Sequence, residues 1–383
     1  MLDSHLYALE KMNIEVKIVK NRADLATFVK LPSRIHHGHD KWMPPILRDE
    51  FRSFNIATNP AFFENDTILA IAWQNNRPVG RIAGIIHRRY NESMGEKTAR
   101  FSYLECEENI VIAKTLLDFV ENWVKDRGMT KIIGPKGFSN QDPQGFLVEG
   151  FGNEPSTEAF YNFEYIVHFL NDLEYVKEVD YVVYKIQIPE KPPELYRKIS
   201  NRFSRRTDFH VIEFTRKKEL QPFIIPVFHL MNETYRHLPG YVVLSEQEML
   251  ALAKRFLPII DPRFVKLVTF HEQAIAFIIG IPNMNAGLRK ANGHLFPFGL
   301  FYILHSRKTS RQMDLMLGAE KPEFRGKGID ALMGSSMVSS AHAAGFDFLD
   351  TNHELEDNIQ VRSEMERVGG VIYKRYRIFQ KSL

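Results

Sequence analysis

The chain has 383 residues, of which 44% are hydrophobic and 25% are charged, a composition typical of a folded globular protein. Fifty basic and 47 acidic residues leave a net charge of +3, so the charge gives no reason to expect a nucleic-acid partner. One cysteine, Cys106, excludes an intramolecular disulfide, and no apolar run approaches the ~18 residues of a membrane span. Since the first residues also lack an apolar signal-peptide core, these features predict a cytoplasmic protein with no membrane span.

A proline-rich segment nearly halves the chain. Three prolines within residues 189–193 cannot lie inside a helix or a central strand. The length also favours two domains of about 100–200 residues each. We therefore predict an N-terminal domain over residues 1–188, a linker or helix over 189–206, and a C-terminal domain over 207–383.

The first half contains a predicted hairpin followed by a strand, a long helix and a short strand. Strands are expected over 67–73, 79–87, 100–106 and 131–134, and a helix over 107–127. The polar residues between the first two strands predict a turn. Gly128 is the expected cap at the end of the helix.

The second half repeats this order of elements with different residues. Strands are expected over 264–270, 274–281, 313–319, 346–350 and 371–380, and helices over 328–344 and 357–368. Ser245 and Glu248 form a capping box that starts a further helix, which ends near Phe256. Two copies of hairpin, strand, helix and strand predict two similar α/β domains.

A glycine-rich turn lies between the strand over 313–319 and the helix over 328–344. Its sequence is Arg325-Gly326-Lys327-Gly328-Ile329-Asp330. Glycines let a backbone approach a phosphate closely, and the first free N–H groups of a helix point at the anion along the helix dipole. The turn therefore predicts an anion cradle; the alternative is a plain, solvated start of a helix.

The stretch over 320–329 resembles the signature of the GNAT-superfamily acyltransferases, Gln/Arg-x-x-Gly-x-Gly/Ala at the start of the central helix. Asn358 lies where that family usually places an asparagine. Phrases in the first half, such as 42–45, 78–83 and 145–151, resemble a group of uncharacterised bacterial proteins with two tandem GNAT-like domains. The resemblance covers roughly residues 14–380. It implies an α/β fold (an α+β mixed sheet) with tandem acyl-CoA N-acyltransferase (GNAT-like) domains, in which the acyl-CoA lies where the sheet splays.

The sequence departs from the family pattern at three places. Asp330 stands where the signature usually has glycine or alanine, and Met365 stands where a helix-borne tyrosine often protonates the departing thiolate. Residues 109–112 contain no glycine where the first copy should have its phosphate loop. The N-terminal domain is therefore predicted to be degenerate in cofactor binding, and the C-terminal domain to hold the cofactor.

The resemblance implies an N-acyltransferase of the acetyltransferase type that uses acetyl-CoA or another acyl-CoA as co-substrate, needs no metal, and acts on an amine of a small molecule. Glu320, at the end of its strand, is the candidate general base, and Tyr373 or Tyr376 is the candidate acid. The predicted cofactor-binding residues are Leu317, Gly318, Ala319, Arg325, Gly326, Lys327, Gly328, Ile329 and Asn358. We expect Gly328→Glu to abolish CoA binding with little loss of stability.

Two other interpretations remain open. Asp330 and Met365 favour a GNAT-like binding or scaffold protein that does not catalyse. A transferase that takes its acyl group from acyl carrier protein or aminoacyl-tRNA would use the basic segment over 197–206 as a docking surface. The intact Arg-Gly-Lys-Gly turn favours acyl-CoA.

Three further segments have a structural and a functional interpretation. The polar loop over 136–144 lines an acceptor pocket between the domains or is a turn. The histidines over 36–39 are predicted to lie in a loop, because no cysteine or carboxylate pattern accompanies them as metal ligands. The phenylalanine-rich segment over 296–301 is predicted to lie in the core.

Overall fold

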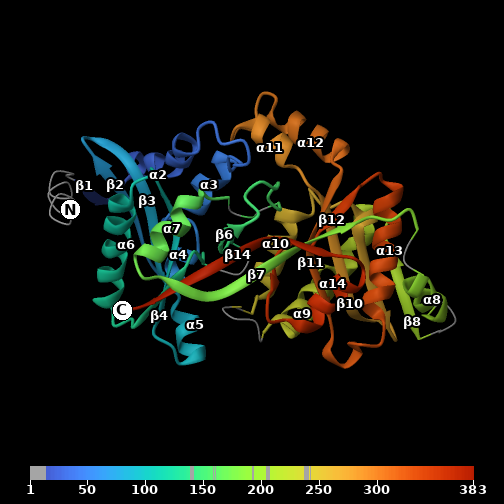
Figure 1. The fold of residues 1–383 in the computed structure, drawn as a ribbon. Coiled ribbons are helices and arrows are strands. Elements are labelled where there is room, and N and C mark those ends of the chain that lie inside the picture. Colours follow the sequence, from blue (N-terminus) through green and yellow to red (C-terminus); the bar gives the residue numbers. More distant parts are fainter. Residues whose placement is uncertain are drawn as a thin grey trace. The chain divides into compact units, whose positions relative to one another are not determined.

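The protein forms two compact units in a computed structural model (Figure 1). The structure describes residues 14–138, 142–157, 159, 161–191, 194–203, 208–236, 241 and 243–383. Unit 1 contains the described parts of Met1–Tyr181 together with Asn285–His305 and Lys374–Leu383, and unit 2 contains the described parts of Val182–Met284 together with Ser306–Tyr373. Each unit is thus assembled from segments that are distant in the sequence.

Unit 1 is built on a mixed sheet in the strand order β1-β2-β3-β4-β5-β14, with β6 beside β14. Neighbouring strands are antiparallel except β4 and β5, which are parallel. Its elements are β1 (Ile14–Ile18), α2 (Arg22–Ile35), α3 (Leu47–Ser53), α4 (Ala61–Glu64), β2 (Asp66–Gln74), β3 (Arg77–Ile86), α5 (Arg88–Met94), β4 (Thr98–Cys106), α6 (Ile110–Lys125), β5 (Lys131–Gly134), β6 (Phe146–Glu149), α7 (Glu164–Asp172), the start of β7 (Val176–Gln187), α11 (Asn285–Ala291), most of α12 (Gly299–Thr309) and most of β14 (Val371–Ser382).

Helices cover both faces of the unit 1 sheet, and the alternation of side chains along β2 shows why. Ala70 and Ala72 belong to the core under α6, whereas Leu69 and Ile71 belong to the core under α2 and α3. Successive side chains of a strand point to opposite faces, so a strand that is apolar at every position requires cover on both sides.

Unit 2 has the same architecture, with the strand order β7-β12-β11-β10-β9-β8 and β13 beside β7. Along this order β11 and β12 are parallel, and the other neighbouring strands are antiparallel. Its elements are the end of β7, α8 (Glu194–Phe203), β8 (Phe209–Glu213), the 3₁₀ turn η1 (Lys217–Phe223), α9 (Ile224–Tyr235), α10 (Glu246–Phe256), η2 (Pro262–Phe264), β9 (Val265–Phe270), β10 (Gln273–Pro282), the end of α12, β11 (Gln312–Glu320), η3 (Pro322–Phe324), α13 (Ile329–Ala343), β12 (Phe348–Asp350), β13 (Glu354–Leu355), α14 (Ile359–Arg367) and the start of β14.

The two units share a detail that supports the predicted repeat. Each central hairpin turns through two non-glycine residues with positive φ, Asn75 and Asn76 in unit 1 and His271 and Glu272 in unit 2. Such a two-residue turn matches the right-handed twist of the strands on either side. The fold class inferred from the sequence, a mixed α/β sheet in each half, is confirmed.

In both units the two parallel strands separate after a short stretch of pairing. β4 and β5 pair over three residues, and the last pair is Arg100 with Ile133. β11 and β12 also pair over three residues, and the last pair is Asp314 with Asp350. Beyond its last pair, β11 continues to Glu320 without β12 beside it. We call each of these places the fork of its unit.

No helix in the described ranges has both the length and the apolar character needed to cross a membrane.

Candidate functional site

The predicted anion cradle lies at the start of α13 in unit 2. Gly326 and Gly328 both have positive φ, 72° and 92°, and no side chain caps the helix. Within the described part of the chain, no group accepts a hydrogen bond from the N–H groups of Gly326, Gly328, Ile329, Asp330 and Ala331. A cluster of free amides at a helix start is the arrangement that binds anions.

The helix α8 packs directly on this turn. A Cβ atom added at Gly328 would lie 3.0 Å from Cγ2 of Ile199, and one at Gly334 would lie 3.1 Å from Cε2 of Tyr196. The expectation that Gly328→Glu leaves stability intact is therefore wrong, because the residue has positive φ and faces α8. Both glycines have a packing role that is independent of any phosphate.

The two basic residues of the turn are exposed. Nε of Arg325 donates a hydrogen bond to the carbonyl oxygen of Glu320 over 3.4 Å, and Nζ of Lys327 lies 5.0 Å from the centre of the Phe324 ring. Neither contact engages the positive charge with a carboxylate. Both side chains are thus placed to meet an anionic ligand at the amide cluster.

Glu320 is the last residue of β11, and its side chain is half-buried. At this point β12 no longer pairs with β11. Its Oε1 is buried and has no hydrogen-bond partner among the described residues. Burial raises the pKa of this carboxyl to about 7, with the nearby charges of Asp330 and Glu364 adding to the effect and Arg325 opposing it. A carboxylate in this state can accept a proton near neutral pH.

Glu320 belongs to a group of carboxylates in unit 2. Burial, followed by the charge of Glu364, raises the pKa of Glu354 to about 8. Burial, followed by the charge of Asp330, raises the pKa of Glu364. We call Glu320, Asp330, Glu354 and Glu364 the carboxylate cluster. Like charges held together in a poorly solvated place favour a cationic ligand or protonation.

The cluster makes stability depend on pH. The raised pKa of Glu354 means that the folded state binds more protons than the unfolded state between about pH 4.5 and 8, so stability falls as the pH rises through this window. Glu354→Gln should therefore raise the free energy of unfolding by about 1–3 kcal/mol at pH 9 and leave it nearly unchanged at pH 4. Urea unfolding at both pH values, with the exposed Glu323→Gln as control, measures this difference. An equal change at both pH values would contradict it.

The candidate acid Tyr373 lies at the root of the unit 2 fork. Its hydroxyl donates a hydrogen bond to Oδ2 of Asp350 over 2.5 Å, and Asp350 forms the last β11–β12 pair. Tyr376, the alternative acid, is fully buried and belongs to unit 1. Met365, at the family's usual tyrosine position, packs against the hydrophobic core. Of these residues, Tyr373 has the hydroxyl placed at the unit 2 fork.

The other predicted cofactor-binding residues hold structural positions as well. Leu317 and Gly318 pair with β10 just after a bulge in the register. The carbonyl oxygen of Gly318 accepts a hydrogen bond from the hydroxyl of Tyr235 over 2.6 Å. Asn358 caps α14 by accepting a hydrogen bond from the N–H of Val361 over 3.4 Å.

Tyr235 is a residue that sequence reasoning missed. It ends α9, and its hydroxyl touches the strand that carries Glu320. Burial raises its pKa above the ordinary value, with the charge of Glu354 adding to this, so the phenol keeps its proton. Nothing in the local sequence marks this residue, because only the packing of α9 on the sheet brings it to the fork.

Unit 1 holds a buried polar network at its own fork. Nε of Arg81 donates a hydrogen bond to Oε2 of Glu105 over 2.7 Å, and Nε2 of His36 lies 3.4 Å from Oε1 of the same carboxylate. The His36 ring is stacked between Trp42 and Phe163, with ring centres 4.8 Å from each. His36, Glu105 and Phe163 are among the residues that line a small pocket.

The histidines over 36–39 lie in a turn after α2, as predicted. Sequence reasoning did not show that the side chain of His36, the C-cap residue of α2, is buried and stacked, with the centre of the His39 ring 5.9 Å from its own. In the described ranges, no three ligating side chains are grouped so that they could hold a metal ion. Their partners come from distant segments, which spacing along the chain does not reveal.

The two forks differ in charge. Arg100 occupies the last parallel pair of unit 1, and the nearby Lys136 is buried. Burial, followed by the charge of Arg100, lowers the pKa of Lys136 to about 7. Asp314 and Asp350, both buried, occupy the last pair of unit 2. The two copies therefore offer opposite charges at the same place in the fold. The loop over 136–144 stays a prediction, since residues 139–141 lie outside the described part.

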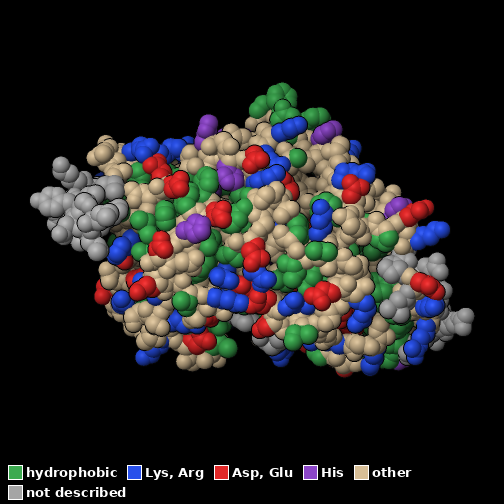
Figure 2. Space-filling model, viewed as in Figure 1, with side chains coloured by type: hydrophobic (Ala, Val, Ile, Leu, Met, Phe, Trp, Pro, Cys, Tyr) green, Lys and Arg blue, Asp and Glu red, His purple; other side chains and the backbone are tan. Residues whose placement is uncertain are grey.

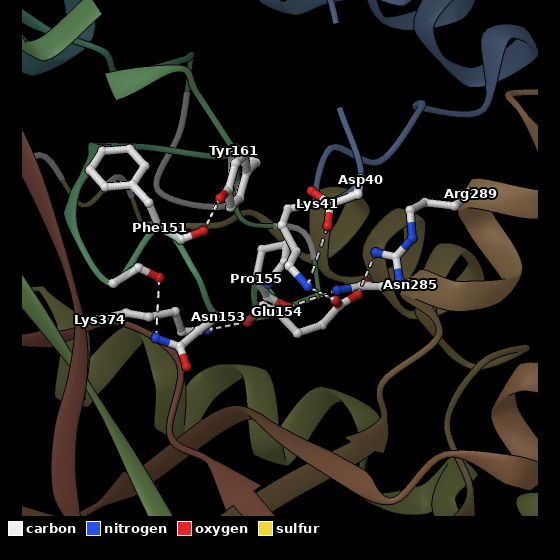
Figure 3. A network of polar contacts seen from close by, with 11 residues as sticks. Asp40, Lys41, Phe151, Asn153, Glu154, Pro155, Tyr161, Asn285, Arg289 and Lys374 are labelled. Atoms are coloured by element: carbon white, nitrogen blue, oxygen red, sulfur yellow. Dashed lines mark hydrogen bonds and ion pairs between the residues drawn. The ribbon is translucent and has the colours of Figure 1, made fainter. Parts of the chain in front are cut away.

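A second polar network in unit 1 surrounds the loop that follows β6 (Figure 3). The guanidinium of Arg289 pairs with the carboxylate of Glu154, and Nζ of Lys41 lies 4.0 Å from the same group. The buried Lys374 donates hydrogen bonds to the carbonyl oxygen of Glu154 over 3.1 Å and to Oγ of Ser156 over 2.9 Å. These contacts tie α11 and β14 to the rest of unit 1.

No protein-family profile matches the chain. The chain is 26% identical over 381 residues to Protein YghO of Escherichia coli K12, covering 96% of this chain and 95% of that protein. It is 25% identical over 380 residues to the bacterial ceramide synthase of Caulobacter vibrioides, covering 97% and 98%. A tandem GNAT protein from the clavulanic acid biosynthesis pathway superimposes with a TM-score of 0.57 and 12% identity, covering 97% of this chain and 98% of that one. The chain therefore has the tandem GNAT fold over nearly its whole length, as the resemblance implied.

Proposed function

We propose that the protein is an acyl-CoA-dependent N-acyltransferase in which unit 2 binds the acyl-CoA and Glu320 takes a proton from the amine acceptor. The observation that supports this most directly is Glu320 itself. Glu320 lies at the end of β11, close to the turn that leads to the free amides of α13. Its pKa is raised to about 7, and its Oε1 has no hydrogen-bond partner among the described residues. A general base works best when its pKa lies near the working pH.

The chemistry requires a neutral amine. An amine arrives at neutral pH as an ammonium ion, which the carboxylate cluster attracts. Loss of a proton to Glu320 frees the nitrogen lone pair to attack the thioester carbonyl carbon. The C–N bond forms, the C–S bond breaks, and the thiolate leaves. The nitrogen, which is cationic after the attack, loses its second proton, and this proton replaces the one that a tyrosine gives to the thiolate. A proton for the thiolate comes from Tyr373 or Tyr235, and N–H groups around 317–319 stabilise the negative charge that develops on the carbonyl oxygen.

The name of one relative suggests an acceptor class. A ceramide is the N-acyl amide of a long-chain amino alcohol, so the name of the Caulobacter protein denotes acyl transfer to such an amine. We propose the same class of acceptor here. Asp330, which departs from the GNAT signature, raises the pKa of Glu320 and adds negative charge beside it, which suits a cationic head group.

We also propose that the N-terminal copy, predicted over residues 1–188, does not bind acyl-CoA. The support is that its predicted loop position carries Asn109, whose side chain caps α6 by accepting a hydrogen bond from the N–H of Val111 over 2.9 Å. A side-chain cap occupies one of the helix-start amides that an anion would use.

The cradle is tested by calorimetric titration with acetyl-CoA and with a long-chain acyl-CoA. The double variant Arg325→Ala/Lys327→Ala should bind either donor at least about tenfold more weakly, because it loses two exposed cations beside the amides. Lys254→Ala, an exposed lysine at the end of α10, is the matched control and should bind as the parent does. Equal affinity of the double variant and the parent would contradict the proposal that this turn binds acyl-CoA.

Turnover separates the catalytic interpretation from a binding protein. Release of free thiol from acyl-CoA is followed with a long-chain amino alcohol and with a short water-soluble amine. Faster release with the long-chain acceptor supports the proposal. Binding of the donor without thiol release would support a protein that no longer catalyses, and failure of both donors to bind would support acyl carrier protein or aminoacyl-tRNA as the donor.

A further inference from the structure

Large apolar side chains are exposed on α12 and in the segment that joins α11 to it. Phe296, Phe298 and Phe301 are 79%, 63% and 65% exposed, and Leu300 and Leu304 are 46% and 47% exposed. The prediction that this phenylalanine-rich segment lies in the core is therefore wrong. We call these five side chains the apolar tip. A contiguous apolar surface of this kind on a folded chain marks an interaction site.

The charged side chains that residues 273–313 contribute around the apolar tip are all basic. No aspartate or glutamate occurs between Gln273 and Met313. The basic and histidine side chains that are exposed on α11, on α12 and between them are Lys290, His294, His305 and Lys308. Figure 2 shows hydrophobic side chains gathered over the α11–α12 region, with lysine, arginine and histidine close by. Arg289 pairs with Glu154 and Arg307 pairs with Asp261, whereas Lys290 and Lys308 are exposed cations beside the apolar centre. An apolar centre with exposed lysines beside it complements an anionic lipid surface.

Hydrogen bonds and an ion pair fix α11, which precedes the apolar tip, to the rest of unit 1. Asn285 is fully buried and donates a hydrogen bond to the carbonyl oxygen of Pro155 over 2.7 Å, and Arg289 pairs with Glu154 (Figure 3). The N–H of Leu47 also donates to the carbonyl oxygen of Gly293 over 2.9 Å. These contacts bind α11 to the body of unit 1, whereas the five side chains of the apolar tip are exposed.

We propose that the apolar tip inserts into the interfacial layer of an anionic lipid bilayer and so docks the protein on a membrane surface. α12 has 11 residues, about 16 Å of helix, and is too short to cross the ~30 Å hydrocarbon core, so the contact lies in the interface. A second copy of the chain is the disfavoured occupant. A two-fold contact would set the basic side chains beside the apolar tip against themselves. The proposal does not depend on the acyl-transfer activity.

Vesicle sedimentation tests the proposal with the full chain. Vesicles of phosphatidylcholine containing ~30% phosphatidylglycerol should retain the protein, and vesicles of phosphatidylcholine alone should retain at least about tenfold less. Phe298→Ser/Phe301→Ser should lose at least about tenfold in affinity without a change in melting temperature, because both side chains are already exposed. Phe63→Ser, which removes a phenylalanine that is 63% exposed on α4, is the matched control and should bind as the parent does.

Further measurements test the role of charge and the insertion of the ring. Lys290→Glu/Lys308→Glu should weaken binding to the anionic vesicles, and the binding of the parent should fall as salt is raised. Phe298→Trp should show a blue-shifted fluorescence maximum on the anionic vesicles, which reports insertion of the ring. Equal binding to both vesicle types, or none to either, would overturn the proposal. So would light scattering that shows a dimer which Phe298→Ser/Phe301→Ser converts to a monomer.

Discussion

Replacing Glu320 by glutamine should lower kcat/KM for acyl transfer by at least about 100-fold, because an amide cannot accept the proton of the acceptor amine. Glutamine keeps the size of the side chain and removes its charge, so the fold should be retained. Thiol release from acyl-CoA measures the rate. Glu323→Gln, an exposed carboxylate in η3, is the matched control and should retain the activity of the parent. A Glu320→Gln variant with parental activity would show that Glu320 is not the general base.

The pH profile gives an independent measure of the same group. With a pKa raised to about 7 by burial and then by Asp330, the basic form of Glu320 is lost as the pH falls, so log(kcat/KM) should decline with unit slope below about pH 7. Asp330→Asn removes a like charge and should move this acidic limb to lower pH. The acceptor amine also titrates, but its ionisation is the same for both proteins. A limb that does not move in Asp330→Asn would show that another group controls the profile.

Replacing Arg81 by methionine should lower the free energy of unfolding by about 3–5 kcal/mol. The Arg81 side chain is almost fully buried, and it bonds both the carboxylate of Glu105 and the carbonyl oxygen of Phe28. The substitution keeps the apolar bulk against the Phe28 ring and leaves a carboxylate that is 17% exposed without its guanidinium. Denaturant unfolding measures the loss.

The double variant Arg81→Met/Glu105→Gln identifies the cause. If the unpaired charge is responsible, removing that charge as well should recover a large part of the loss. Arg88→Met, which breaks the exposed pair of Arg88 with Asp66, is the control and should cost less than about 1 kcal/mol. Equal losses in the single and double variants would show that packing, not charge, is what Arg81 contributes.

The strongly periodic elements of the fold were predictable. The helix over 107–127 corresponds to α6, whose buried face carries Ile112, Leu116 and Val120 at helical spacing, and β2 and β3 match the predicted hairpin closely. Two of the missed helices, α3 and α5, are short and mostly polar, so their sequences carry little periodicity. The division into residues 1–188 and 207–383 stays a proposal about the two copies.

Local motifs of the site were predictable, but groups assembled from distant segments were not. The turn from Arg325 to Gly328 starts α13 as its glycines indicate, and its role in binding stays a prediction. The charge of Glu364 acts on both Glu320 and Glu354 only because β13 and α14 fold onto the same unit. The prediction that residues 296–301 lie in the core was wrong for a different reason, since hydrophobic composition alone does not say whether a side chain is buried.

The assembly of unit 1 from separate segments has a consequence for how the protein is made. Residues Lys374–Leu383 supply most of the strand that pairs with β5, and Asn285–His305 supplies α11. A ribosome releases a chain from its N-terminus, so the first sheet stays incomplete until these late segments have left the exit tunnel. Throughout synthesis the edge of β5 remains an open template for foreign strands. We therefore expect a gene fragment that ends at the proline-rich segment to yield aggregates rather than a folded half.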